Sequence, residues 1–385
     1  MYRWKAYNYL DIKATFISMG YEVDEVWQHL ESYDVAPEFA EKLAGDLKGG
    51  DYDFVFTVNY FAVIAGVCHE LSIPYVSWSC DNPLISMYHE SVFYDTNIIF
   101  TFDQTNYREF RDMGVSNIHY LPLAVDTERI GAVLSGRDTT PFKNTSSFVG
   151  SLYERNTYDR IERRLSDHLR GYFEAVMEIQ SDLYGSSIVE DALTPDILAE
   201  LSEYFTLDKS DGSFSDLGLI FSTTTLGFKI AQIERKRALM ALAKKMPVTI
   251  YSNSDTSDLL RVTFRGSLDY WSELPLVFAG TDINLNLTIP NIKSGLPLRI
   301  FDVLGCGGFL LTNFQAETPM FFKEGEDLVS FYSREDMVEK AVFYAAHEDE
   351  RRRIAASGHE KVRRYHSYRT RIGEMLDTLS GYGIK

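Results

Sequence analysis

The hydrophobic pattern of the first third of the chain alternates between strand-like and helix-like segments. FVFTV at 54–58 is a largely apolar run, as expected for a parallel strand that is covered on both faces. Further strands are predicted at 74–78, 97–102 and 119–123. Helices are predicted at 39–48, at 61–71 and up to about residue 113. Strands separated by helices at these intervals need right-handed crossover connections, so the pattern predicts a doubly wound α/β domain with a parallel sheet.

A second series of strand-like segments starts at 147–150 (SFVG). It continues at 248–251, 262–266, 283–287, 309–312 and 328–331, with helices expected at 231–245, 273–279, 334–346 and 349–364. The polar stretch before this series has no periodicity, and a helical, acidic stretch interrupts the series. We therefore expect an N-terminal Rossmann-like domain (1–125), a linker (126–146), a C-terminal Rossmann-like domain (147–365) with a helical insertion at about 160–215, and a C-terminal helix (366–385) that can return to the first domain.

The composition of the 385 residues limits the classes of partner. The chain is 45% hydrophobic and carries a net charge of −18. Such acidity argues against binding to a nucleic-acid backbone or to an anionic membrane surface. Cys68, Cys80 and Cys306 are too widely spaced for a disulfide framework or a zinc site. With no visible signal peptide or membrane-spanning run, we expect a cytoplasmic protein.

The stretch 294–313 (SGLPLRIFDVLGCGGFLLTN) carries the clearest chemical signal. Gly295 stands where a loop enters a short helix, and a helix start offers unpaired N–H groups and a positive dipole end. Arg299 and Asp302, three residues apart, project from one face of that helix. A cation and a carboxylate there suit a phosphate and a ribose hydroxyl. An Asp that caps the helix or forms an internal salt bridge is the structural alternative.

Other loops after predicted strands add candidates for the same site. Gly150 ends SFVG, and Arg155 follows five residues later. The backbone there could approach a diphosphate and Arg155 could pair with it, although an ordinary surface arginine fits equally well. Asn286 and Thr288 are polar residues at the end of an otherwise apolar strand, and Lys293 precedes the glycine loop. We place all of these on the donor side of the predicted site.

In the N-terminal half, polar residues follow two buried strands. Asn59 and Tyr60 come after the first, and Asp81 and Asn82 come after the second. Asp81 is the candidate general base, and an Asp turn before a proline is its structural alternative. Asn59, Tyr60 and Asn82 are candidates for the acceptor side. His89 is a weaker alternative base, and no metal-ligand spacing is visible.

The same segments carry a family resemblance. The run INLNLTIPNIKSGLPLRIFDVLGCGGFLLTN and the tail AASGHEKVRRYH resemble the C-terminal half of CgeB-type, spore-maturation glycosyltransferases. YDFVFTVNYF, IPYVSWSCDNP and YLPLAVD are similar to the domain that precedes it. The resemblance implies a GT-B fold, with two Rossmann-like domains facing a central cleft. It also implies transfer of a sugar from a nucleotide donor without a required metal.

The resemblance assigns roles to individual residues. Gly150 and Arg155 match the family's first glycine loop, and Asp302 falls where related enzymes bind ribose. The donor segment is matched by Asn286, Ser294, Gly295, Arg299 and Asp302. Related retaining enzymes carry a further acidic residue two helical turns earlier, where this chain has Lys293, Ser294 and Gly295. The donor sugar and the stereochemical outcome therefore stay open.

These observations predict a nucleotide-sugar-dependent hexosyltransferase. The expected co-substrate is a UDP-sugar, with no cofactor and no metal, and the acceptor and oligomeric state are open. Arg155 and Arg299 are assigned to the diphosphate, and Asp81 to activation of the acceptor if the reaction inverts configuration. The alternatives are a nucleotide-sugar epimerase or hydrolase of GT-B shape and a non-catalytic glycosyltransferase-like scaffold.

Overall fold

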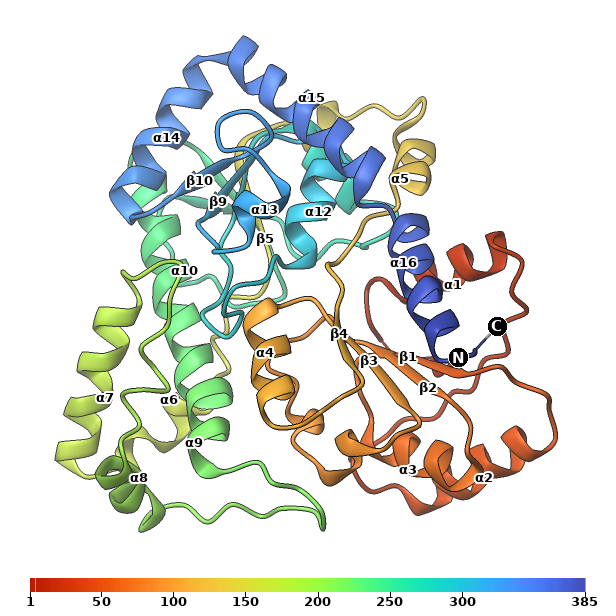
Figure 1. Cartoon of the computed structure of the whole chain (residues 1–385). Coiled ribbons are helices and arrows are strands. Elements are labelled where there is room, and N and C mark those ends of the chain that lie inside the picture. The colour runs from red at the N-terminus through yellow and green to blue at the C-terminus, as the bar shows by residue number, and fades with distance from the viewer. Residues whose placement is uncertain (4, 385) are drawn as a thin grey trace. The chain divides into compact units, whose positions relative to one another are not determined.

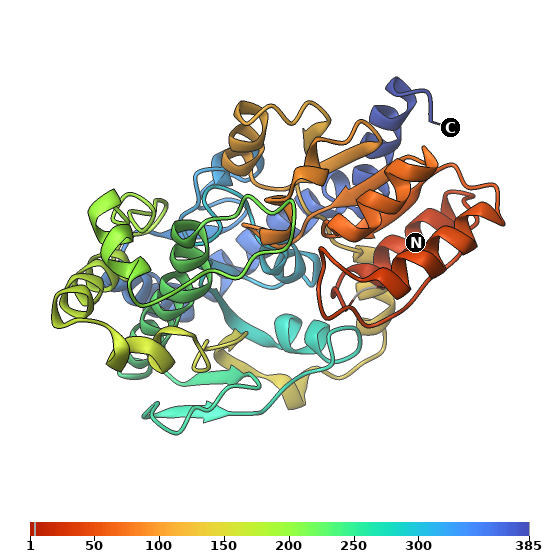
Figure 2. The ribbon, with the colours of Figure 1, turned by 90° about the horizontal axis from the view of Figure 1, so that it is seen from below.

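The computed structural model describes residues 1–3 and 5–384. The chain forms two compact units, each assembled from separate stretches of sequence (Figure 1; Figure 2 shows the ribbon from below). Unit 1 comprises residues 1–124, 207–216 and 368–385. Unit 2 comprises residues 125–206 and 217–367. No helix among the described residues is long and apolar enough to cross a membrane.

Unit 1 is built on a parallel sheet of four strands in the order β1-β2-β3-β4. The strands are β1 (Val55–Val58), β2 (Tyr75–Trp78), β3 (Asn97–Thr101) and β4 (Ile118–Tyr120). Its helices are α1 (Tyr9–Ser18), α2 (Pro37–Lys48), α3 (Ala62–Leu71), α4 (Gln104–Asp112) and α16 (Tyr368–Gly381), with 3-10 turns at η1 (Ile85–Met87) and η2 (Glu90–Phe93). Every residue of the first three strands is buried, as expected for strands covered on both faces. The predicted parallel α/β sheet is confirmed.

Two later segments of the chain complete unit 1. Tyr368 of α16 packs edge-on against Trp78, with ring centroids 6.1 Å apart. In the segment 207–216, the Ser210 hydroxyl donates a hydrogen bond of 2.6 Å to Asp34. Segments that are distant in sequence therefore belong to the same compact unit.

Unit 2 is built on a parallel sheet of six strands in the order β10-β9-β8-β5-β6-β7. The strands are β5 (Asn144–Val149), β6 (Val248–Tyr251), β7 (Val262–Phe264), β8 (Thr281–Asn286), β9 (Leu310–Asn313) and β10 (Val329–Phe331). The helices over the sheet are α10 (Phe228–Ala243), α11 (Leu274–Gly280), α12 (Leu298–Gly305), α13 (Thr318–Phe321), α14 (Arg334–Ala346) and α15 (Glu348–Tyr365). Both units therefore have parallel α/β sheets.

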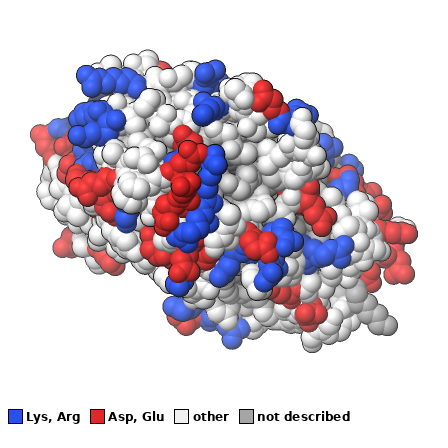
Figure 3. All heavy atoms as spheres, turned by 90° about the horizontal axis from the view of Figure 1, so that it is seen from above, with Lys and Arg blue, Asp and Glu red and all other residues white. Residues whose placement is uncertain are grey.

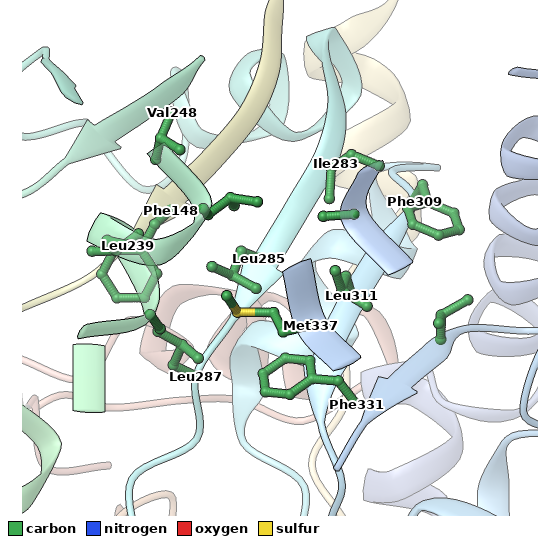
Figure 4. Close-up of a cluster of buried hydrophobic side chains, with 14 of the residues drawn as sticks. Phe148, Leu239, Val248, Ile283, Leu285, Leu287, Phe309, Leu311, Phe331 and Met337 are labelled. Atoms are coloured by element: carbon green, nitrogen blue, oxygen red, sulfur yellow. The ribbon is translucent and has the colours of Figure 1, made fainter. Parts of the chain in front are cut away.

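The core of unit 2 lies between the sheet and the pair α10 and α14 (Figure 4). Leu285 of β8 and Leu311 of β9 meet Leu239 of α10 and Met337 of α14 in one buried cluster. Side chains alternate along a strand, so Asn284, next to Leu285, points to the opposite face of the sheet. Its amide donates to the Phe278 carbonyl of α11, which lies on that face. The two sides of β8 thus differ in polarity.

A helical region precedes α10 in unit 2. It contains α6 (Tyr158–Ile161), η4 (Glu162–Arg164), α7 (Asp167–Gln180), α8 (Pro195–Ser202) and α9 (Leu217–Ile220). These helices bury a hydrophobic cluster of their own, which includes Phe173, Leu201 and Phe221. A π-helical segment, η5 (Phe221–Gly227), joins α9 to α10 without a break. The helical region therefore continues directly into a helix that covers the sheet.

The segment expected to be a linker, 126–146, contains regular structure. It holds α5 (Thr127–Leu134), the turn η3 (Thr140–Phe142) and the start of β5. Asp126 caps α5, since its carboxylate accepts a 2.9 Å hydrogen bond from the Arg129 N–H. Ile130 is the one buried residue of the helix. A single buried position leaves no periodic signal in the sequence, which is why this helix was not predicted.

Exposed charges on α15 pair with one another. Arg353 contacts Glu350, and Arg363 contacts Glu360, at 2.7 and 2.9 Å. The face in Figure 3 accordingly shows acidic and basic side chains interleaved. Such exposed pairs contribute little to stability and mark a solvated surface. The net negative charge is therefore not gathered into one acidic patch on this face.

Candidate functional site

The loop after β8 leads into α12 as the sequence predicts. Strand β8 ends at Asn286, and α12 starts at Leu298 with Pro297 as its N-cap. The glycine turn after α12 includes Gly307, whose φ of 69° suits a residue without a side chain. Strand β9 follows directly. The loop, helix, turn and strand expected for this segment are confirmed.

Arg299 and Asp302 lie on one face of α12, as their spacing predicts. Arg299 Nη1 is 3.6 Å from Asp302 Oδ2, and the guanidinium lies over the Phe278 ring at 5.3 Å. The Arg299 side chain is 24% exposed. Its buried Nη1 has no hydrogen-bond acceptor among the described residues. Arg299 therefore points into the protein and keeps a donor for another group.

Asp302 is more deeply buried than a ligand-binding carboxylate would need to be. It is 3% exposed, and its Oδ1 accepts a 2.7 Å hydrogen bond from the Tyr270 hydroxyl. Burial raises the pKa of the Asp302 carboxyl, while Arg299, Tyr270 and Arg129 lower it. Asp302 is thus already engaged by protein groups.

Arg235, a residue that the sequence analysis did not single out, joins two strand-end loops. Nη1 donates to the Ser151 carbonyl after β5, and Nη2 donates to the Leu287 carbonyl after β8, both at 2.7 Å. The guanidinium also lies over the Tyr153 ring, 4.9 Å from its centroid. Its buried Nε has no acceptor among the described residues. The two carbonyls therefore fix the position of the Arg235 guanidinium, and Nε is still able to donate a hydrogen bond.

The charges of Arg235 and Arg299 act on each other. Burial lowers the pKa of the Arg235 guanidinium, Tyr153 and Glu234 raise it, and Arg299 lowers it again. Two partly buried cations that repel each other favour an anion close to both. Arg299 is thus close enough to Arg235 to act on its charge, whereas Arg155 is exposed in its loop.

Gly150 lies beside Arg235 and, among the described residues, packs tightly only against the Phe148 ring. A Cβ at Gly150 would lie 3.8 Å from Arg235 Nη1 and 3.3 Å from the Phe148 ring. The Gly150 N–H donates to the Tyr251 carbonyl at 3.1 Å. The Gly150 N–H therefore fixes the start of the loop to the neighbouring strand β6.

Contacts from several elements fix the rest of the loop after β8. The Asn291 amide donates to the Thr223 carbonyl in the π-helical segment at 3.0 Å. Lys293 forms an ion pair of 2.9 Å with Glu190, and the Ser294 hydroxyl donates to Glu317 at 2.7 Å. Gly295, next to Ser294, also has interactions within the protein. The predicted donor residues Lys293 and Ser294 thus have carboxylate partners in the protein.

Asn286 and Thr288 connect the ends of β8 and β9. The Asn286 amide donates to the hydroxyls of Thr288 and Thr312 at 3.0 and 2.9 Å. The Thr288 N–H donates to the Asn313 side chain at 2.7 Å. Both predicted residues are buried in this network. In the structure they hold the strand ends on which the loop depends.

In unit 1, Asn59 and Asp81 come together at the ends of β1 and β2. The Asn59 amide donates to Asp81 Oδ2 at 2.7 Å, and its oxygen accepts from the Cys80 N–H at 2.9 Å. Asn59 has a φ of 66°, a conformation that asparagine tolerates better than most residues. Asp81 lies at the surface of unit 1, but neighbouring protein groups partly desolvate its carboxyl and raise its pKa, while the hydrogen bond from Asn59 lowers it. A carboxylate held by an amide can accept a proton.

The other predicted residues of unit 1 differ in accessibility. Tyr60 is fully buried, with its hydroxyl 2.8 Å from that of Ser91. Neither amide atom of Asn82, which is also buried, has a hydrogen-bond partner among the described residues. The His89 ring contacts the Ser91 hydroxyl and the Asp211 carbonyl at 2.9 and 3.0 Å. Tyr60 and His89 thus have structural partners, and Asn82 keeps its hydrogen-bonding capacity.

Within residues 1–3 and 5–384, no group of three or more His, Cys, Asp or Glu side chains could hold a metal ion.

Comparisons with known proteins place the site in context. A family model described as glycosyl transferase-like matches residues 234–377. The match starts next to Arg235 and includes the whole segment from β8 to β9. Curated proteins give no match to this sequence.

Solved structures show the same fold. HepE from Anabaena, in a complex with UDP and glucose, is 10% identical with a TM-score of 0.55, over 96% of this chain and 89% of that chain. Sucrose-phosphate synthase from Thermosynechococcus elongatus is 9% identical with a TM-score of 0.57, over 96% and 92%. An α,α-trehalose-phosphate synthase (UDP-forming) from Burkholderia vietnamiensis is 12% identical with a TM-score of 0.51, over 91% and 76%. The chain has the GT-B fold.

Proposed function

We propose that this protein is a cytoplasmic, CgeB-type glycosyltransferase that transfers a sugar from a UDP-sugar to an acceptor without a metal ion. The observation that carries the proposal is the pair Arg235 and Arg299 at the loop between β8 and α12. Arg235 Nε and Arg299 Nη1 are buried donors that have no hydrogen-bond acceptor among the described residues, and Arg299 Nη1 has a charged partner in Asp302 at 3.6 Å. An anion that binds both cations would satisfy these donors.

A nucleoside diphosphate fits this pair by charge and by chemistry. During sugar transfer, the acceptor oxygen forms a bond to the anomeric carbon while the bond from that carbon to the diphosphate oxygen breaks. Negative charge then develops on the leaving diphosphate, and fixed cations stabilise it. We assign Arg235 and Arg299 to this task, with backbone groups near Gly150 and Gly295. Arg235 thereby replaces Arg155 in our assignment.

We assign the remaining residues by their contacts. Asp302 orients Arg299, which is consistent with its burial and its bond to Tyr270. Asn286 and Thr288 hold the ends of β8 and β9 together, and so position the loop between β8 and α12. In unit 1, Asp81 would accept the proton of the acceptor hydroxyl in an inverting reaction, with Asn59 holding the carboxylate. The identity of a UDP-sugar as donor is supported by the relative solved with UDP and glucose.

A two-stage experiment tests the proposal. Calorimetry with UDP, GDP, ADP and CDP should show selective binding of UDP, and a non-catalytic scaffold would bind none of them. A panel of UDP-sugars is then incubated with and without candidate acceptors, in buffer that contains EDTA. Release of UDP with formation of a glycoside supports the transferase. UDP release or sugar isomerisation with donor alone would support a hydrolase or an epimerase instead.

A further inference from the structure

The end of β9 and the residues after it hold the loop between β8 and α12. The Asn313 side chain accepts a hydrogen bond from the Thr288 N–H at 2.7 Å and donates one to the Thr288 carbonyl at 3.2 Å. Two residues later, the Gln315 amide donates to the Ile292 carbonyl at 3.4 Å. Alternate residues of one segment therefore bind successive points of the loop.

Glu317 is the third residue in this series, and its carboxylate is buried. It is 2% exposed and stands directly before α13. Its Oε1 accepts a 2.7 Å hydrogen bond from the Ser294 hydroxyl, and its N–H donates to the Ser294 carbonyl at 3.2 Å. Hydrogen bonds to a carboxylate are stronger than those between neutral groups. Ser294 is thus held at both its side chain and its backbone.

Ser294 stands at the entry to α12, where we propose that the diphosphate binds. Residues 295–297 connect it to Leu298, and Arg299 lies in the first turn of the helix. The N-cap residue, Pro297, makes no side-chain hydrogen bond to the helix start. The position of the first turn therefore depends on the loop that precedes it, and a shift of Ser294 would move the start of α12.

We infer that Glu317 is a positioning residue for the donor diphosphate. It holds Ser294, and through Ser294 the start of α12, so that Gly295 and Arg299 lie where they can contact the diphosphate. The inference rests on the proposed function, because it concerns the binding of that diphosphate. Glu317 acts through the loop and needs no contact with the nucleotide.

Ser357 of α15 provides a matched control in the same unit. Its hydroxyl donates to the Asp327 carboxylate at 2.7 Å, the same distance as in the pair Ser294 and Glu317. Asp327 is also buried, with 5% exposure. Ser357→Ala therefore removes the same kind of hydrogen bond, but from a pair that does not include the loop between β8 and α12.

Hydrogen exchange tests the hold on the loop without any ligand. It is measured over residues 288–298 in wild type, Glu317→Ala, Glu317→Gln, Ser294→Ala and Ser357→Ala, with thermal melts to show which variants fold. Exchange should be about tenfold faster in Glu317→Ala and in Ser294→Ala, the effect of one lost hydrogen bond to a charged group. Glu317→Gln should stay close to wild type, because its amide oxygen can still accept the Ser294 hydroxyl. Ser357→Ala should exchange as wild type does.

Unchanged exchange in Glu317→Ala would overturn the inference. If Glu317→Ala does not fold, Ser294→Ala removes the same hydrogen bond, and unchanged exchange in that variant would overturn the inference instead.

Calorimetry with UDP and UMP tests the effect on the diphosphate. Glu317→Ala and Ser294→Ala should weaken UDP binding about tenfold and UMP binding by less than about twofold, because UMP lacks the second phosphate. Glu317→Gln and Ser357→Ala should keep a UDP affinity within about threefold of wild type. Unchanged UDP affinity in Glu317→Ala and Ser294→Ala, or equal losses for UDP and UMP, would overturn the inference. If wild type binds UDP no better than UMP, the proposed function itself fails, whatever the exchange rates of the loop.

Discussion

The strand ends of the two units have similar backbones but opposite chemistry. In unit 2, the loops after β5 and β8 are joined by a cation, and a second cation lies at the start of α12. In unit 1, the loops after β1 and β2 are joined by an amide that holds a carboxylate. Both sheets are parallel, so the fold itself does not distinguish them. From the side chains at the strand ends we propose anion binding in unit 2 and proton transfer in unit 1.

The largest effect should come from Asp81→Asn. If Asp81 accepts the acceptor proton, turnover should fall by about 100-fold or more, the contribution of a general base. UDP affinity should stay within about twofold, since unit 2 alone is expected to bind it. Steady-state kinetics and calorimetry on the same preparation check both values. Loss of UDP binding in Asp81→Asn would contradict the assignment of UDP binding to unit 2 alone.

Arg299→Ala should abolish most donor turnover and weaken UDP binding by about 1.5–3 kcal/mol, the usual value of a hydrogen bond to a charged group. The matched variant Arg155→Ala changes an exposed arginine and should shift UDP binding by less than about 0.5 kcal/mol. Calorimetry on the two variants ranks the two arginines. An equal loss of UDP affinity in the two variants would show that Arg155 also binds the diphosphate.

The pH dependence of stability should reveal Glu234. Burial raises the pKa of Glu234 from its ordinary value of about 4.5 to about 8 in the folded protein, so the folded state holds a proton that the unfolded state releases. The free energy of unfolding should therefore fall between about pH 4.5 and pH 8, by at most about 1.4 kcal/mol for each pH unit. Urea unfolding of wild type and Glu234→Gln at several pH values measures the difference. Parallel curves for the two proteins would show that Glu234 is ionised when folded.

Asp302→Asn should give the smallest effect. The asparagine side chain can still accept a hydrogen bond from the Tyr270 hydroxyl. It can no longer form an ion pair with Arg299. We expect the donor KM to rise several-fold, with a melting temperature close to that of wild type. Initial rates at varied donor concentration, together with thermal melts, provide the check. A large loss of stability without a change in KM would show that Asp302 serves only the fold.

The local features of the site could be predicted from the sequence. Apolar runs such as FVFTV gave strands because a buried parallel strand needs apolar side chains on both faces. The Arg299 and Asp302 pair was predictable because three-residue spacing is a property of a single helix. Gly295 marked the loop that enters α12, because a glycine between two periodic segments is also a local signal.

The contacts between distant segments could not be predicted in this way. Arg235 reaches the loops after β5 and β8 because those strands are neighbours in the sheet, and one sequence does not give strand order. One signal was present, since Arg235 shares a helical stripe with Ala238, Leu239 and Leu242, all of which are buried. A cation on an apolar stripe needs a reason, and here the reason is the neighbouring strand ends.

The most direct test of the account is a comparison of UDP with UMP by calorimetry, in wild type and in the Arg235→Ala, Arg299→Ala double variant. If the two arginines bind the diphosphate, wild type should prefer UDP by at least about tenfold, and the double variant should lose most of that preference. Equal affinity of wild type for UDP and UMP, or an unchanged preference in the double variant, would contradict the account.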